Sequence, residues 1–216
     1  MIVIGHRGAC AYKLENTIDS FLYALELGAD GIEFDVQKCK TGEIVVIHDE
    51  TVDRTTNFKG FVNSLSINDI KRLNIPTLEE VLLKLNKKTL VNIELKTLGI
   101  EKKINDTIHK FLDNGWEYEN FIISSFYISN LINMHRLNKK IKLGILTHSN
   151  NAIKFVRKIH PYSIHIHVNN INPYIVNYAH RHNIKVFVWT INNEEEKKKM
   201  EQLHVDGIFS DNILHV

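Results

Sequence analysis

The chain has 216 residues, 44 % of them hydrophobic, and its 27 basic and 25 acidic residues give a formal net charge of +2. Charges of both signs are interspersed along the chain, so we expect no nucleic-acid partner. Apolar runs stay short of the ~20 residues of a membrane span, so we expect no stable membrane insertion.

The cysteines and the first residues narrow the class of protein further. Cys10 and Cys39 stand in neither a CxxC nor a zinc spacing, which predicts two free thiols. Residues 1–5 read as a strand and not as a signal peptide. We therefore predict a soluble, cytoplasmic protein with one domain over residues 1–216, and we make no prediction of its oligomeric state.

Short runs of β-branched residues alternate with amphipathic helical stretches. Eight such runs are predicted strands: 2–5, 31–37, 90–96, 121–125, 142–146, 163–168, 185–190 and 207–210. The main predicted helices span 17–27, 77–85, 100–112, 127–137, 150–159, 172–182 and 193–203. This alternation predicts an α/β fold, the TIM (β/α)8 barrel, with parallel strands and right-handed crossovers. An open doubly wound sheet is the alternative, but no GxGxxG motif follows the first strand.

One further predicted strand, 43–48, breaks the alternation. Only a short turn separates it from the strand at 31–37, whereas a parallel return needs a crossover of about a dozen residues. The two strands should therefore form an antiparallel β-hairpin extension. If Thr41 and Gly42 are its two-residue loop, Asp35 faces His48, with Cβ atoms about 4.5–5.5 Å apart.

The segment after this hairpin, residues 49–75, is a long loop insertion. A cap signature at Ser66 predicts a short helix within it. Loops of this length in compact domains often have a function.

Acidic side chains lie on the inward faces of two predicted barrel strands. Glu33 and Asp35 share one face of the second strand. Glu94 and Lys96 share one face of the third, so these groups meet in the lumen near the carboxyl ends, where barrel enzymes have their active sites. Three buried carboxylates need a counter-charge, either a structural network with Lys96 and Arg7 or a divalent metal ion. The all-oxygen set favours Mg²⁺ or Ca²⁺ over zinc.

Two histidines lie near the predicted mouth of the barrel, where barrel enzymes have their active sites. His6 and Arg7 lie between two glycines directly after the first strand, where the backbone can turn sharply and approach a ligand. His6 and His48 can exchange protons near neutral pH, and the planar fork of Arg7 suits a phosphate. His165 and His167 share one strand face without a third ligand at suitable spacing, so we interpret them as barrel-interior or neutral core groups.

Several motifs follow one another in a family order over essentially the whole chain. They are His6-Arg7-Gly8, Glu15-Asn16-Thr17, Glu33-Phe34-Asp35-Val36, Val46-Ile47-His48-Asp49, Arg54-Thr55-Thr56, Ile75-Pro76-Thr77-Leu78, Asn92-Ile93-Glu94-Leu95-Lys96, Ser125-Phe126, Val188-Trp189-Thr190, and Asp206-Gly207-Ile208 with Asp211. Each is weak alone, but together they are specific, and with them the chain resembles the glycerophosphodiester phosphodiesterases. Leu14 and Asn212 stand where the family usually has proline, which affects loop placement and substrate choice more than the reaction.

The resemblance implies a barrel that hydrolyses glycerophosphodiesters to glycerol 3-phosphate and an alcohol. The site that it implies consists of the acid/base pair His6 and His48, the ligands Glu33, Asp35 and Glu94 of one divalent metal ion (Mg²⁺ or Ca²⁺), the phosphate-binding Arg7 and Lys96, and the apolar wall Trp189. The attacking group can be the glycerol 2-hydroxyl, giving a cyclic phosphate, or a water molecule. The family and the lack of an evident second metal favour the cyclic route.

Two other functions are weighed against this one. A lysophospholipase D-type phosphodiesterase would need exposed aromatic residues near the mouth, for which Phe58 and Phe61 are candidates. A non-catalytic barrel that binds a phosphorylated ligand would lack a histidine or a carboxylate of the site, and none is missing here.

Overall fold

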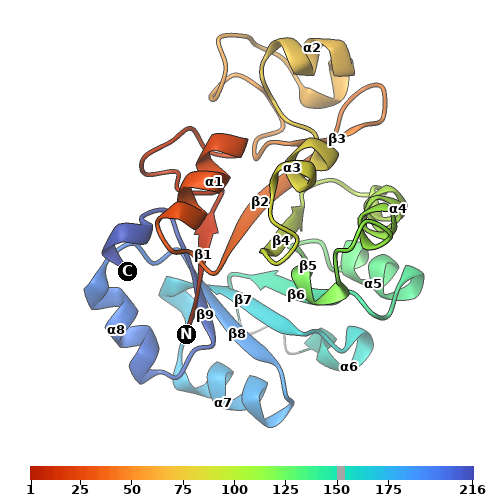
Figure 1. The fold of residues 1–216 in the computed structure, drawn as a ribbon. Coiled ribbons are helices and arrows are strands. Elements are labelled where there is room, and N and C mark those ends of the chain that lie inside the picture. Colours follow the sequence, from red (N-terminus) through yellow and green to blue (C-terminus); the bar gives the residue numbers. More distant parts are fainter. Residues whose placement is uncertain (150–153) are drawn as a thin grey trace.

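The computed structural model describes residues 1–149 and 154–216, and these form a closed barrel (Figure 1). Within them, eight parallel strands close into a ring, because β1 pairs with both β2 and β9. The barrel strands are β1 (Ile2–His6), β2 (Gly31–Lys38), β4 (Leu90–Leu95), β5 (Phe121–Ser125), β6 (Lys142–Thr147), β7 (Ser163–His167), β8 (Lys185–Trp189) and β9 (Gly207–Ser210). The predicted TIM barrel is confirmed.

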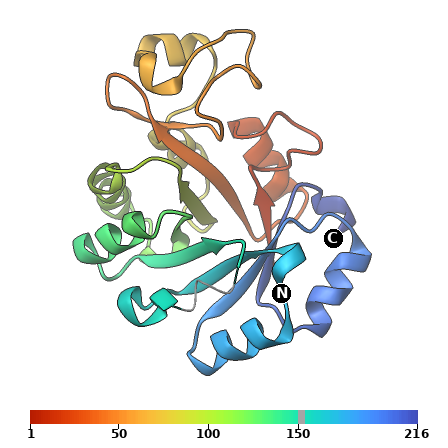
Figure 2. The ribbon, with the colours of Figure 1, turned by 180° about the vertical axis from the view of Figure 1, so that it is seen from behind.

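Helices surround the barrel, as the view from behind also shows (Figure 2). They are α1 (Ile18–Glu26), α3 (Leu78–Lys84), α4 (Glu101–Leu112), α5 (Ile128–Leu137), α6 (Val156–Ile159), α7 (Pro173–Arg181) and α8 (Glu194–Gln202). Thr17 caps α1 by accepting a hydrogen bond from Ser20 N, and Thr77 and Glu80 form a capping box on α3.

Of the helix predicted at 150–159, residues 150–153 lie outside the described residues, and α6 is the part that the structure describes. No helix in the described part of the chain is long and apolar enough to cross a membrane.

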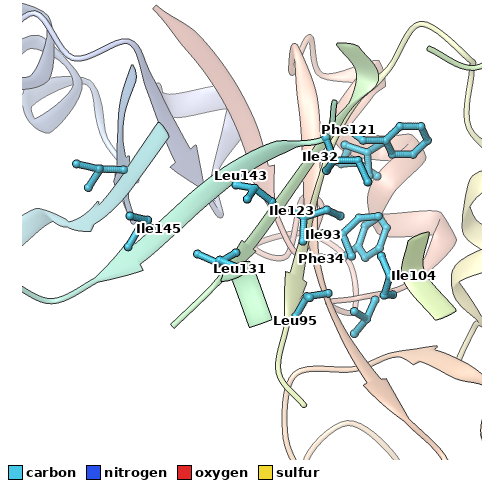
Figure 3. Packing of buried hydrophobic residues seen from close by; sticks show 14 of the residues in the cluster. Ile32, Phe34, Ile93, Leu95, Ile104, Phe121, Ile123, Leu131, Leu143 and Ile145 are labelled. Carbon is cyan, nitrogen blue, oxygen red and sulfur yellow. The ribbon is translucent and has the colours of Figure 1, made fainter. Parts of the chain in front are cut away.

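The layer between the strands and the helices is apolar (Figure 3). Ile32 and Phe34 of β2 are fully buried there, next to Ile93 of β4 and Ile104 of α4. Burying one such side chain stabilises the fold by ~1.5–3 kcal/mol. Because successive strand residues point to opposite faces, this outward packing turns Glu33 of β2 into the lumen.

The lumen itself is a packed core away from its mouth. Ile4, Ile122, Phe187 and Phe209 form a separate buried cluster there. The polar groups of the site lie above this plug, at the carboxyl ends of the strands.

The hairpin extension exists, but its register differs from the prediction. β3 (Ile44–Val46) pairs antiparallel with β2 outside the ring, with Val36 opposite Val46. Asp35 is therefore opposite Ile47, whose N–H donates to the Asp35 carbonyl at 3.0 Å. The prediction that Asp35 faces His48 is wrong by one residue.

The turn explains this shift. Cys39 N–H donates to the Glu43 carbonyl, which makes 40–42 a three-residue loop instead of the expected two-residue one. Gly42 has a φ of +100°, the left-handed conformation that closes such loops and that side chains disfavour.

The insertion between β3 and α3 has a small core of its own. It contains the 3₁₀ turn η1 (Val62–Ser64) and the helix α2 (Ile67–Arg72), which begins with a capping box at Ser66. Its buried residues are Cys39, Val45, Ile47, Val52, Val62, Ile70 and Ile75. In both views this segment lies to one side of the barrel, beyond α1 and α3 (Figures 1 and 2).

Candidate active site

A cavity at the carboxyl end of the barrel contains all but one of the predicted site residues. It is lined by His6, Arg7, Glu33, His48, Asn92, Glu94, Lys96, Phe126, Leu146, His165, Trp189 and Phe209. Its volume is about 60 Å³, and a hollow of about 350 Å³ adjoins it on the insertion side of His48. Asp35, the remaining predicted residue, is 1 % exposed beside it.

The three predicted metal ligands form one buried cluster. Oxygen atoms of Glu33, Asp35 and Glu94 lie within 4.8 Å of one another. Burial and the charge of Asp35 raise the pKa of Glu33 and the pKa of Glu94. Strand alternation places Glu33 and Asp35 on the same face of β2. The parallel register sets Glu94 of β4 beside Asp35.

Counter-charges satisfy only part of this cluster. Lys96 Nζ lies 2.9 Å from Glu94 Oε1 and 3.6 Å from Asp35 Oδ1. Arg7 N–H donates to Glu33 Oε2 at 2.9 Å, but Glu33 Oε1 is buried with no hydrogen-bond partner among the described residues. An unpaired buried carboxylate oxygen is costly, so the set fits a divalent cation, and its all-oxygen chemistry fits a hard one.

The loop after β1 fixes His6 and Arg7 above the cluster. Arg7 has a φ of +55° and Gly8 a φ of +87°, so the chain turns back at once. A Cβ on Gly8 would lie 2.3 Å from Ser20 Oγ, because the loop packs directly on α1. Arg7 also pairs with Glu15 at 3.0 Å and approaches Asp35 at 3.4 Å, so its guanidinium neutralises carboxylates on both sides.

His6 is held by a residue from the other end of the chain. Its Nδ1 lies 2.7 Å from Asp211 Oδ1, directly after β9. Burial lowers the pKa of His6, but the Asp211 hydrogen bond and the charge of Glu33 outweigh this, and the pKa is raised. The Nδ1 contact leaves Nε2 free to exchange a proton.

Asp211 also accepts a hydrogen bond from Cys10 Sγ at 2.9 Å. Burial and this carboxylate raise the pKa of the Cys10 thiol. The thiol therefore stays protonated and is a poor nucleophile.

His48 also has a carboxylate partner at Nδ1, but its pKa shifts in the opposite direction to that of His6. Its Nδ1 lies 2.7 Å from Asp49 Oδ1. Burial lowers the pKa of His48, the charge of Asp35 and the Asp49 hydrogen bond oppose this, and the net pKa is lowered. Gln37 Nε2 donates to the His48 carbonyl at 3.0 Å, which fixes the backbone of His48 after β3.

Arg54 of the insertion connects the two sides of the site. Its guanidinium donates to both oxygens of Asp49 at 2.7 and 3.1 Å, and to both oxygens of Glu15 at 2.6 and 2.8 Å. Glu15 pairs with Arg7, and Asp49 pairs with His48. Arg54 therefore joins the insertion to the loop after β1, and it shares the charge of Asp49 with His48.

Aromatic rings border the cavity on the side of β8. The Trp189 ring lies 5.7 Å from Phe126, 5.0 Å from His148 and 4.7 Å from His167, measured between centroids. His165 lies below, fully buried, and burial lowers its pKa to about 3. His165 is therefore neutral, as predicted from the sequence.

Three residues that complete this site have no role in the prediction from the sequence. Asp211, Glu15 and Arg54 all stand in motifs that mark the family, but their partners lie far away in the chain. Asp211 had a usable signal: it follows the last strand, and a closed barrel sets that strand beside the first. Nothing local to Arg54 indicates that it joins Glu15 to Asp49.

The chain is similar to proteins of one family over nearly its whole length. The Glycerophosphoryl diester phosphodiesterase family model matches residues 6–215. A glycerophosphodiester phosphodiesterase of Caldanaerobacter subterraneus subsp. tengcongensis is 39 % identical over 231 residues, covering 97 % of this chain and 93 % of the relative. One of Bacillus altitudinis is 34 % identical over 233 residues, covering 97 % and 94 %.

Solved structures give the same result. A glycerophosphodiester phosphodiesterase of Thermotoga maritima is 31 % identical, covers 99 % of this chain and 96 % of its own, and has a TM-score of 0.85. An Oleispira antarctica phosphodiesterase solved with the product sn-glycerol-3-phosphate has a TM-score of 0.89 and covers 99 % and 94 %. Its 24 % identity supports the fold alone. The chain belongs to the glycerophosphoryl diester phosphodiesterase family and is a phosphoric diester hydrolase.

Proposed function

We propose that this enzyme hydrolyses glycerophosphodiesters to glycerol 3-phosphate and an alcohol, with His6 and His48 as its acid/base pair. The observation that supports this most directly is one cavity lined by both histidines, by Glu33 and Glu94 of the acidic cluster, and by Lys96. The names of the relatives supply the substrate class, and the product bound to the Oleispira antarctica structure is the expected one.

Glu33, Asp35 and Glu94 would hold one divalent metal ion, Mg²⁺ or Ca²⁺. When bound, such an ion neutralises charge on a phosphoryl group as a Lewis acid. Arg7 and Lys96 border the cluster and would bind the remaining phosphate oxygens. Trp189 would form an apolar wall beside the organic part of the substrate.

The surroundings of the two histidines support different roles for them. His6 lies between Asp211 and Glu33, and Asp211 is outside the acidic cluster, so its hydrogen bond favours the protonated form of His6. Burial and the nearby charge of Lys96 favour the neutral form of His48, which also shares Asp49 with Arg54. His6 is therefore the proposed acid and His48 the proposed base.

The two groups can perform the reaction in two steps. His48 takes the proton of the glycerol 2-hydroxyl, whose oxygen bonds to phosphorus, while the bond to the head-group oxygen breaks and that oxygen takes the proton of His6. This leaves a cyclic phosphate, a neutral His6 and a protonated His48. His6 then takes a proton from water, whose oxygen bonds to phosphorus while the bond between phosphorus and the glycerol 2-oxygen breaks, and His48 returns its proton to that 2-oxygen.

One assay panel tests the proposed substrate class. Glycerophosphocholine, glycerophosphoethanolamine and a lysophospholipid are each incubated with and without Mg²⁺ or Ca²⁺. Release of the head-group alcohol is measured for all three, and release of glycerol 3-phosphate for the two water-soluble diesters. We expect hydrolysis of the first two. Inactivity on both water-soluble diesters under every metal condition would overturn the proposal.

Exposed apolar residues favour the lysophospholipid as a second candidate substrate. Phe58 and Phe61 of the insertion are 51 % and 54 % exposed. Leu98 and Tyr127 are also exposed and line a groove with Lys96. A lysophospholipid turned over faster than glycerophosphocholine in the same panel would favour this candidate.

The cytoplasmic location and the one-domain organisation stay predictions from the sequence.

A further inference from the structure

A second group of metal-ligating side chains lies on the Nδ1 side of His6. Among the described residues, donor atoms of His6, Cys10 and Asp211 lie within 4.8 Å of one another, like those of the acidic cluster. His6 Nδ1 and Cys10 Sγ both approach the same oxygen, Asp211 Oδ1, at 2.7 and 2.9 Å. We propose that this triad is an inhibitory binding site for a borderline or soft divalent metal ion, namely Zn²⁺.

The donor set separates this site from the acidic cluster. Imidazole, thiolate and one carboxylate are the ligands that zinc takes in proteins, whereas Mg²⁺ and Ca²⁺ prefer oxygen alone. A thiol is not needed to donate a hydrogen bond to Asp211, because a serine hydroxyl would do the same. The sulfur is what gives the triad an affinity for zinc.

The three ligands are fixed by contacts of their own. Asn192 Nδ2 donates to Asp211 Oδ2 at 2.9 Å and so orients the other oxygen toward His6 and Cys10. Ala11 N–H donates to the Asp211 carbonyl at 3.0 Å, which ties the Cys10 loop to the end of β9. Outer contacts of this kind orient ligands and raise metal affinity.

The triad is also open to solvent. The side chains of His6 and Asp211 are 21 % and 30 % exposed, and Cys10 is half-buried. Zinc can therefore enter without unfolding the barrel, with water as its fourth ligand. Binding releases the thiol proton of Cys10 to solvent, together with the proton that His6 shares with Asp211.

Zinc at this position would stop the reaction through His6. The ion replaces the hydrogen bond from His6 to Asp211, and its positive charge disfavours the protonated imidazole. This inhibitory effect rests on the proposed role of His6, whereas the site itself does not. Binding and inhibition are therefore measured separately.

Binding is tested with Co²⁺, a spectroscopic substitute for zinc, in the presence of excess Mg²⁺ to occupy the acidic cluster. We expect a thiolate-to-cobalt charge-transfer absorption in the wild-type protein. Cys10→Ser should lose it, and Cys39→Ser should keep it, because Cys39 belongs to no group of metal-ligating side chains among the described residues. No absorption in the wild type, or an unchanged one in Cys10→Ser, would overturn the site.

Inhibition is tested as the Zn²⁺ concentration that halves the activity of each protein at fixed excess Mg²⁺. Loss of an outer contact already weakens metal binding by about 10–100-fold, so loss of the sulfur ligand should raise this concentration at least ~10-fold. Cys39→Ser should match the wild type. Equal inhibition of Cys10→Ser and wild type would place the zinc effect at the acidic cluster instead. If no diester is hydrolysed, the proposed function fails, but the cobalt spectra still decide the site.

Discussion

His6 Nδ1 lies 2.7 Å from Asp211 Oδ1, although the two residues are 205 positions apart. The contact exists because β9 pairs with β1 and closes the barrel. It orients the imidazole and stabilises its protonated form. Asp211 is therefore a positioning residue for the proposed acid.

Asp211→Asn should move the alkaline limb of the pH–activity profile. The Asp211 hydrogen bond raises the pKa of His6, so its loss lowers that pKa and His6 loses its proton at a lower pH. A hydrogen bond to a charged group contributes about 1.5–3 kcal/mol, and one pKa unit is ~1.36 kcal/mol, so we expect a shift of about one pH unit or more. The measurement is log kcat/KM against pH. An unchanged alkaline limb would show that Asp211 does not act through His6.

Arg54→Ala should move the opposite limb in the opposite direction. Without Arg54, the charge of Asp49 acts on His48 alone and raises the pKa of His48, so the acid limb moves to higher pH. We also expect turnover to fall about tenfold, because the insertion is no longer tied to Glu15. Arg72→Ala is the matched control, since Arg72 is 82 % exposed on α2. If the two variants behave alike, Arg54 has no positioning role.

Removing either histidine of the acid/base pair should nearly abolish turnover. A general acid or base contributes about 10²–10⁴-fold, so we expect His6→Ala and His48→Ala each to lose at least ~100-fold in kcat. Circular dichroism should show an intact barrel, because both side chains are partly exposed at the mouth. Near-normal activity in one variant would remove that histidine from the mechanism.

The acidic cluster predicts a metal dependence of both activity and stability. A chelator should abolish activity, and Mg²⁺ or Ca²⁺ should restore it. The pKa of Glu33 is raised in the metal-free fold, so the metal-free protein loses stability as pH rises above the ordinary value of 4.5. Glu33→Gln removes that loss and should raise the metal-free Tm at neutral pH by a few degrees, since ~1 kcal/mol corresponds to about 2–4 °C for a chain of this size.

Metal addition provides the control for this prediction. It should raise the Tm of the wild type and leave that of Glu33→Gln nearly unchanged. Full activity in excess chelator, or an equal metal-dependent shift in both proteins, would remove the metal from this site.

The sequence predicted those parts of the structure that depend on local alternation. The strands Phe121–Ser125 and Gly207–Ser210 have the predicted bounds, and the alternation that buries Ile32 and Phe34 outward also brings Glu33 and Asp35 together inside. The hairpin register was missed because Cys39 pairs with Glu43 and leaves a three-residue loop, whereas a glycine at position 42 suits a two-residue loop equally well. The partners of His6 and Arg54 were missed because they depend on barrel closure and on the path of a long insertion.

Barrel closure by β9 also determines the stage of protein synthesis at which the site can be complete. The strand that pairs with β1 leaves the ribosome after β8, and the carboxylate that holds His6 follows it. Before these residues emerge, a nascent chain already carries both histidines and the acidic cluster, but its barrel cannot close and His6 lacks the Asp211 contact. Catalytic competence should therefore appear only after β9 has emerged and closed the barrel on β1.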